Sequence, residues 1–178
     1  MKHMPNAGKA LTLVFTAAFL VACSGTDTKP QDDAAMEAQA RADEMAQQAR
    51  DEKARMESAA ADNMRRLESE AMAAGTVFYF EFDSSTLTPA AQVALDAHIS
   101  LLRTNDRNVR LDGHTDERGT RDYNMALGER RANAVRDYMV VNGVASYRIE
   151  SVSYGEEQPM SYGSGESNWS QNRRVELK

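Results

Sequence analysis

The sequence predicts an α/β fold (an α+β sandwich), in which helices cover a small mixed β-sheet. The prediction rests on the alternation of strands with helices over residues 76–178. Two further observations describe what precedes this domain: the first 22 residues are typical of a secretion signal, and residues 34–74 are rich in helix-forming residues. A chain of 178 residues has room for one domain of ordinary size and such appendages.

Residues 1–22 match a signal peptide. Lys2 and Lys9 give a basic start, and a short apolar segment runs from Ala10 to Ala22. Directly after it comes Cys23, the only cysteine, which cannot form an intrachain disulfide. A free thiol is one interpretation. The other is a bacterial lipobox, which implies by resemblance that Cys23 is lipidated and becomes the first residue of the mature chain.

A lipidated Cys23 predicts attachment to a membrane. Each buried CH₂ contributes roughly 0.8 kcal/mol, so two or more acyl chains suffice for stable anchoring. Ser24 follows the cysteine, and by family analogy the absence of Asp there favours the periplasmic face of the outer membrane. Residues 23–33 are polar and contain Pro30, which predicts a lipidated flexible tether. No apolar stretch reaches about 18 residues, so no transmembrane helix is expected.

Residues 34–74 predict a helical spacer. They contain no Gly or Pro and are dominated by Ala, Met, Glu, Gln and Arg, which would form a rod of about 60 Å. The apolar residues suggest a seam, but their spacing does not sustain a heptad. A solvated single helix and a weak oligomeric coil both remain open.

The remaining elements follow from local signals. Gly75 marks the boundary, Thr88 and Pro89 start a helix that runs to about Arg103, and Thr120 can cap a helix ending at Asn142-Gly143. The inward-facing residues of the first of these helices are predicted to be Val93, Leu95, Ile99 and Leu102. Strands are predicted at Thr76–Phe82, Asn108–Gly113, Arg148–Ser153 and Arg173–Leu177, with a helical turn at Ser167–Gln171.

The strongest functional signal is the pair Asp116 and Arg131. Leu127, Arg131 and Val135 share one helical face, so the Arg131 guanidinium is predicted to point at the core. A buried guanidinium needs an anionic partner, and Asp116 in the preceding loop is the candidate. Two interpretations follow: a structural ion pair, or a fixed cation and anion that grip a zwitterion such as an amino-acid terminus.

Three further residues are candidates for the same site. Asp83 ends the first predicted strand, where it either caps local amides or forms part of an anion-binding turn. Asn124 either orients the loop or touches the ligand. Leu127 is a core residue or a ligand contact. Gly128 inside a helix costs about 1 kcal/mol relative to Ala, which close approach of another segment would explain.

The motifs around these residues resemble the peptidoglycan-binding domain of OmpA-like proteins. The sequence motif of that family is TD-x-x-G followed by N-x-x-L-[SG]-x-x-RA-x-x-V. The chain matches it at Thr115-Asp116, Gly119, Asn124, Leu127-Gly128, Arg131-Ala132 and Val135. The flanking pieces DERG, VSYGEE and NRRVEL are similar to one branch of the family, the peptidoglycan-associated lipoproteins. The resemblance covers residues 76–178.

The resemblance implies a function. In OmpA-like domains these positions hold diaminopimelate of the peptidoglycan stem peptide, with Arg131 taking a carboxylate, Asp116 the ammonium, and the Asp83 turn beside the ligand. The branch implies a lipoprotein of a Tol-Pal-type system that ties the outer membrane to peptidoglycan, with a TolB-like periplasmic partner. The competing interpretation is a structural spacer lipoprotein that oligomerises through its helical segment.

Other function classes are disfavoured. The net charge of −6 argues against nonspecific nucleic-acid binding. We expect no enzyme, catalytic residue, metal or cofactor, because His114 and Asp116 supply only two possible ligands and a zinc site needs three or four. A flagellar stator would need a transmembrane helix, and a porin would need about eight or more strands before the domain. Tyr154, Tyr162 and Trp169 are either scattered surface aromatics or part of a protein interface.

Overall fold

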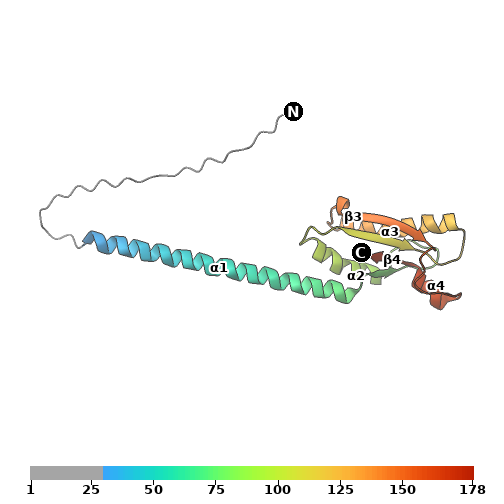
Figure 1. Ribbon diagram of the computed structural model, residues 1–178, viewed down its shortest axis with the longest axis horizontal. Coiled ribbons are helices and arrows are strands. Elements are labelled where there is room, and N and C mark those ends of the chain that lie inside the picture. The colour runs from blue at the N-terminus through green and yellow to red at the C-terminus, as the bar shows by residue number, and fades with distance from the viewer. Residues whose placement is uncertain (1–29) are drawn as a thin grey trace, which may run out of the picture. The chain divides into compact units, whose positions relative to one another are not determined.

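A computed structural model describes residues 30–178 of the chain (Figure 1). The predicted signal peptide, the lipidation of Cys23 and the tether over residues 24–29 lie outside the described residues. The described residues divide into two units between residues 49 and 50. Helix α1 (Pro30–Ala74) begins four residues before the predicted start at Ala34. Pro30 takes its first position, where the fixed φ of proline suits a helix and its missing N–H costs nothing.

Helix α1 is solvated along most of its length. Every side chain from residue 34 to 63 is exposed, and pairs such as Arg41 with Glu37 stabilise the helix from outside. Near its C-terminus Leu67 and Ala71 become buried, at 6% and 3% exposure. Glu68 pairs with Arg107 at 2.9 Å. The last turns of α1 therefore pack on the folded domain.

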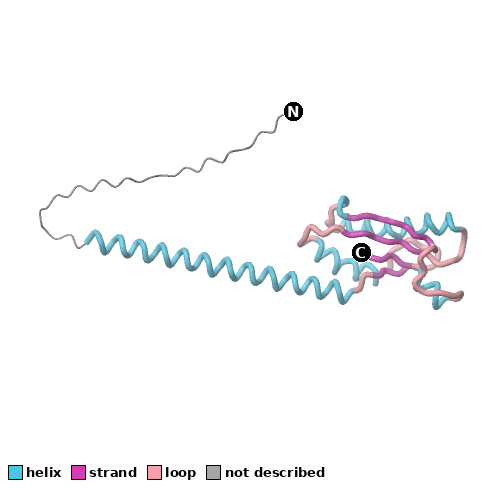
Figure 2. Tube along the Cα trace, in the orientation of Figure 1, coloured by secondary structure: helices cyan, strands magenta, loops and turns pink. Residues whose placement is uncertain are grey.

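The sheet has four strands in the order β1-β4-β2-β3 (Figure 2). Strands β1 (Val77–Tyr79) and β2 (Val109–His114) both pair antiparallel with β4 (Arg174–Leu177). Strand β3 (Ile149–Gly155) pairs parallel with β2. The predicted small mixed sheet is thus confirmed.

Helices α2 (Pro89–Leu102) and α3 (Arg121–Val141) pack on the same side of this sheet (Figure 1). The predicted caps are present: Thr88 accepts a bond from the Ala91 amide, and Thr120 accepts one from the Tyr123 amide. A short helix, Ser146–Arg148, and α4 (Glu166–Asn172) complete the domain. The prediction that Val93 faces inward is wrong, since it is 71% exposed. It lies two residues from the buried positions 91 and 95, which places it on the opposite side of the helix.

One apolar core joins the two helices and all four strands. Helix α3 approaches β2 closely at two glycines. A Cβ on Gly128 would overlap the Ser153 hydroxyl and lie 3.0 Å from the Gly113 carbonyl oxygen. The close approach expected at Gly128 is confirmed. It brings the start of α3 against the end of β2, where the candidate site forms.

Candidate ligand-binding site

A pocket of about 180 Å³ lies at the end of β2, bounded by the turn after β1 and the first turns of α3. We call it the Asp116 pocket. All five residues predicted from the sequence to contact a ligand line it: Asp83, Asp116, Asn124, Leu127 and Arg131. Residues from three separate segments therefore meet in one cavity. Its other lining residues are Phe82, Thr115, Arg118, Gly119 and Tyr123.

Arg131 is fully buried and bonded to backbone carbonyls. Its guanidinium donates to the carbonyl oxygens of Ser84 at 2.8 Å, His114 at 3.0 Å and Glu81 at 3.1 Å. Burial lowers the pKa of Arg131 to about 10, so the side chain is still cationic at neutral pH. Three of its five N–H groups are used, which leaves one on each terminal nitrogen.

Asp116 does not form the expected ion pair with Arg131. Its carboxylate binds Arg118, with Nε 3.1 Å from Oδ1 and Nη2 2.7 Å from Oδ2, and also Arg173 Nη1 at 3.3 Å. Burial by itself raises the pKa of Asp116, but the hydrogen bonds from Arg118 outweigh it and the net pKa is lowered. The interpretation of Asp116 and Arg131 as a structural ion pair is therefore wrong. Backbone carbonyl oxygens accept the hydrogen bonds of Arg131 instead.

Asp83 occupies a turn whose backbone is unusual. Its φ is 53°, the left-handed region that few non-glycine residues adopt. Its carboxylate accepts a hydrogen bond from the Tyr123 hydroxyl, which raises the pKa of Tyr123. Asp83 therefore links the turn after β1 to helix α3 through a side chain, rather than by capping local amides.

Asn124 and Leu127 shape the wall of the pocket. The Asn124 amide is buried and donates to the Arg118 carbonyl at 3.1 Å and to the Glu156 carboxylate, so it does orient the loop. Leu127 is 6% exposed but does not belong to the main core cluster. It forms an apolar side of the Asp116 pocket.

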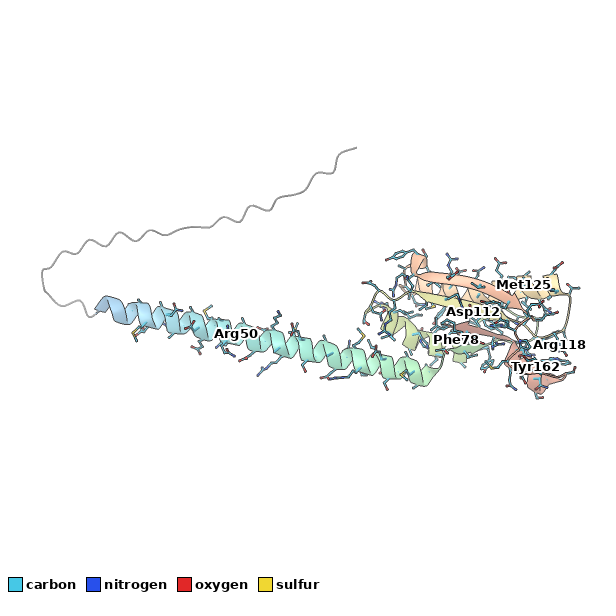
Figure 3. The ribbon with its side chains drawn as sticks, viewed as in Figure 1. Arg50, Phe78, Asp112, Arg118, Met125 and Tyr162 are labelled. Carbon is cyan, nitrogen blue, oxygen red and sulfur yellow. The ribbon has the colours of Figure 1, made fainter. Side chains whose placement is uncertain are left out.

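Two arginines at the site were missed by the sequence analysis. Arg118 lies at the end of the domain that also carries Tyr162 (Figure 3), with its guanidinium 3.9 Å from the Phe82 ring centre and 4.2 Å from that of Trp169. Arg173 is 4% exposed and bonds Phe80, Asp116 and Glu166. The DERG and NRRVEL pieces contained both residues, but nothing local indicates that they share a carboxylate.

The lining of the pocket thus combines a buried cation, Arg131, with the carboxylates of Asp83 and Asp116, the two signs of charge that a zwitterion carries. Within residues 30–178, no group of three or more His, Cys, Asp or Glu side chains could hold a metal ion. The same part of the chain has no helix with the length and apolar character needed to cross a membrane.

Comparison with known proteins identifies the family of the chain. The family model described as "OmpA family" matches residues 79–173, more than half of the chain. The chain belongs to the OmpA family. The OmpA-like fold predicted from the motifs is therefore confirmed.

Several relatives carry the name peptidoglycan-associated lipoprotein. Those of Pseudomonas putida and Pseudomonas aeruginosa are each 58% identical over 108 residues, which is 61% of this chain and 65% and 64% of theirs. The matched part is therefore just under two thirds of these relatives. The crystal structure of the peptidoglycan-associated lipoprotein from Burkholderia pseudomallei is 42% identical with a TM-score of 0.57, and covers 58% of this chain and 89% of that one. These OmpA-family relatives are named for an association and not for a reaction, in agreement with the prediction that the chain is not an enzyme.

Proposed function

We propose that the chain binds peptidoglycan non-covalently through the diaminopimelate of the stem peptide and tethers the outer membrane to the cell wall. The main support for this proposal is the burial and hydrogen bonding of Arg131. Its guanidinium is completely buried at the pocket, and three backbone carbonyls hold it in place. Three carbonyls hold this cation in one position beside the pocket, which lowers the entropic cost of binding an anion there.

The charged residues of the pocket assign a position to the carboxylate and to the ammonium of the ligand. The remaining N–H groups on the two terminal nitrogens of Arg131 suit the two oxygens of one carboxylate. The ammonium belongs at the carboxylates of Asp116 and Asp83, which line the same cavity. Both charges of a free amino-acid end are thereby matched. Diaminopimelate in a peptidoglycan stem presents such an end on its side chain.

We propose that Cys23 carries the lipid anchor in the outer membrane and that α1 serves as the spacer between anchor and domain. The relatives named as peptidoglycan-associated lipoproteins support this arrangement. A TolB-like periplasmic partner within a Tol-Pal-type system completes the proposal.

The test is co-sedimentation of the full chain with purified sacculi that contain diaminopimelate. We expect saturable binding that free meso-diaminopimelate competes away. Pimelate, which has the two carboxylates without the ammonium groups, is the matched competitor and should have little effect. Absence of co-sedimentation, or equal competition by pimelate, would contradict the proposal and favour a spacer that oligomerises through α1.

A further inference from the structure

The carboxylate of Asp116 has no acceptor position left for a ligand. A carboxylate offers about four lone-pair positions, two on each oxygen. Oδ1 accepts from the backbone amide of Arg118 and from its Nε, both at 3.1 Å. Oδ2 accepts from Arg118 Nη2 at 2.7 Å and from Arg173 Nη1 at 3.3 Å. An ammonium can reach Asp116 only if one of these donors leaves.

Of the four donors, the two from the Arg118 side chain can leave at least cost. The Arg173 side chain is 5% exposed and is also bonded to the Phe80 carbonyl at 3.1 Å and to Glu166 at 2.5 Å. The backbone amide of Arg118 is part of the loop itself. The Arg118 side chain, by contrast, is 30% exposed and lines the pocket.

We infer that Arg118 is an internal competitor that occupies Asp116 until the ammonium of the ligand takes its place. This inference rests on the proposed function and adds a specificity-determining role for a residue outside the predicted site. A ligand that offers only carboxylates has no group that can replace the guanidinium on Asp116. Arg118 thereby restricts the Asp116 end of the pocket to ligands that carry an ammonium.

The structure also supplies a place for the displaced guanidinium. It already lies between the rings of Phe82 and Trp169, at 3.9 and 4.2 Å from their centres. Glu166 Oε2 is 3.8 Å from Arg118 Nη2, and the Glu166 side chain is 64% exposed. A short shift between the two rings would exchange Asp116 for Glu166 without leaving the guanidinium unpaired. Cation–π contact holds it near the pocket throughout.

The first readout is the sign of the affinity change in an Arg118→Met variant of the full chain. Methionine keeps the backbone amide on Asp116 and an apolar side chain between the rings, but it cannot compete for the carboxylate. Since partly exposed ion pairs contribute up to about 1 kcal/mol, we expect about two- to five-fold tighter binding of meso-diaminopimelate. Arg121→Met is the matched control, because Arg121 is exposed, pairs with Glu157 and lies outside the pocket lining.

The second readout is the fluorescence of Trp169, the only tryptophan of the chain. Saturation with meso-diaminopimelate should change its emission in the unmodified chain and in Arg121→Met, because Arg118 moves against the ring. It should change far less in Arg118→Met. If Arg118→Met does not fold, Arg118→Gln replaces it in both measurements.

The outcomes separate the two proposals. Tighter binding by the Arg118 variant together with the Trp169 response supports the inference. Unchanged or weaker binding by that variant, or a silent Trp169 in the unmodified chain at saturation, overturns the inference and leaves peptidoglycan binding intact. If the unmodified chain binds neither meso-diaminopimelate nor sacculi, the proposed function fails and the inference falls with it.

Discussion

Among single residues, buried arginines donate their hydrogen bonds to backbone carbonyls, where the sequence had led us to expect an acidic side chain. Arg131 and Arg148 are both buried, and both donate mainly to carbonyl oxygens. A guanidinium has five N–H donors in a plane, so carbonyls at loop ends can satisfy it without an anion. This explains why a buried arginine could be predicted from helical spacing while its partner could not.

His114 provides a pH-dependent prediction. Its ring is 3% exposed, is stacked on Tyr154, and has a buried Nδ1 without a hydrogen-bond partner among the described residues. Burial, with a smaller contribution from Arg174, lowers the pKa of His114 from 6.5 to about 4. The neutral ring stabilises the fold above pH 6.5. As the pH falls from 6.5 towards 4, the unfolded chain binds a proton that the folded chain does not, so stability is lost.

We expect the free energy of unfolding to fall by up to about 3 kcal/mol from this residue across that window. His114→Gln should flatten the decline relative to the unmodified chain. Urea unfolding at pH 7 and pH 4.5 measures the difference. Equal pH slopes in the two proteins would show that His114 does not titrate in this way.

At Gly128, substitution by alanine should change the stability in the direction opposite to that expected from helix propensity. In an open helix, Gly→Ala stabilises by about 1 kcal/mol. Gly128→Ala should instead destabilise by about 1–3 kcal/mol, since the new Cβ would overlap Ser153 and crowd Gly113. Thermal unfolding of this variant and of Ala126→Gly, an exposed position of the same helix, provides the comparison. A more stable Gly128→Ala would refute the close approach of α3 and β2.

Among the elements, helix α1 carries apolar residues whose spacing does not fit a heptad repeat. Three of its apolar residues, Met45, Met56 and Leu67, lie eleven positions apart, with Ala49, Ala60 and Ala71 four residues after each. An eleven-residue repeat keeps one face of a helix apolar where a seven-residue repeat does not fit. Only the last repeat is buried, at Leu67 and Ala71, whereas Met45 and Met56 are about 70% exposed.

This difference yields a matched pair of substitutions in α1. Leu67→Ala should destabilise the domain by about 2 kcal/mol or more, because it removes a buried side chain from the contact between helix and domain. Met56→Ala should change the stability by less than about 0.5 kcal/mol. Urea unfolding followed by tryptophan fluorescence reports on the domain itself. Equal effects of the two substitutions would mean that α1 does not pack there.

Most elements of the domain could be predicted because their signals are local. The caps at Thr88 and Thr120 and the stop at Gly143 depend only on neighbouring residues. The sheet order could not be predicted, because it places the last strand between the first and second. The clustering of Asp83 with Asp116 and Arg131 was expected from the family motif. The sharing of Asp116 by Arg118 and Arg173 joins positions 57 residues apart, which no local pattern shows.

At the scale of the whole molecule, the proposal depends on a membrane anchor as well as on the binding pocket. Cys23→Ser should abolish labelling with radioactive palmitate and release the chain from the outer membrane, since acyl chains supply the anchoring energy. Membrane fractionation checks this directly. Retention of the serine variant in the outer-membrane fraction, with cleavage after Ala22, would contradict the lipidation of Cys23.

Binding of the ligand's carboxylate by Arg131 can be tested with a single measurement. It is the affinity of folded Arg131→Lys and Arg148→Lys variants for meso-diaminopimelate, with thermal stability recorded on the same samples. Arg148 is the matched control, because it is also buried and bonded to carbonyls but lies outside the Asp116 pocket. Both variants should lose stability. Only Arg131→Lys should lose affinity, by about 30-fold or more, because a desolvated bidentate contact is lost. Equal affinities in the two variants would contradict carboxylate binding by Arg131.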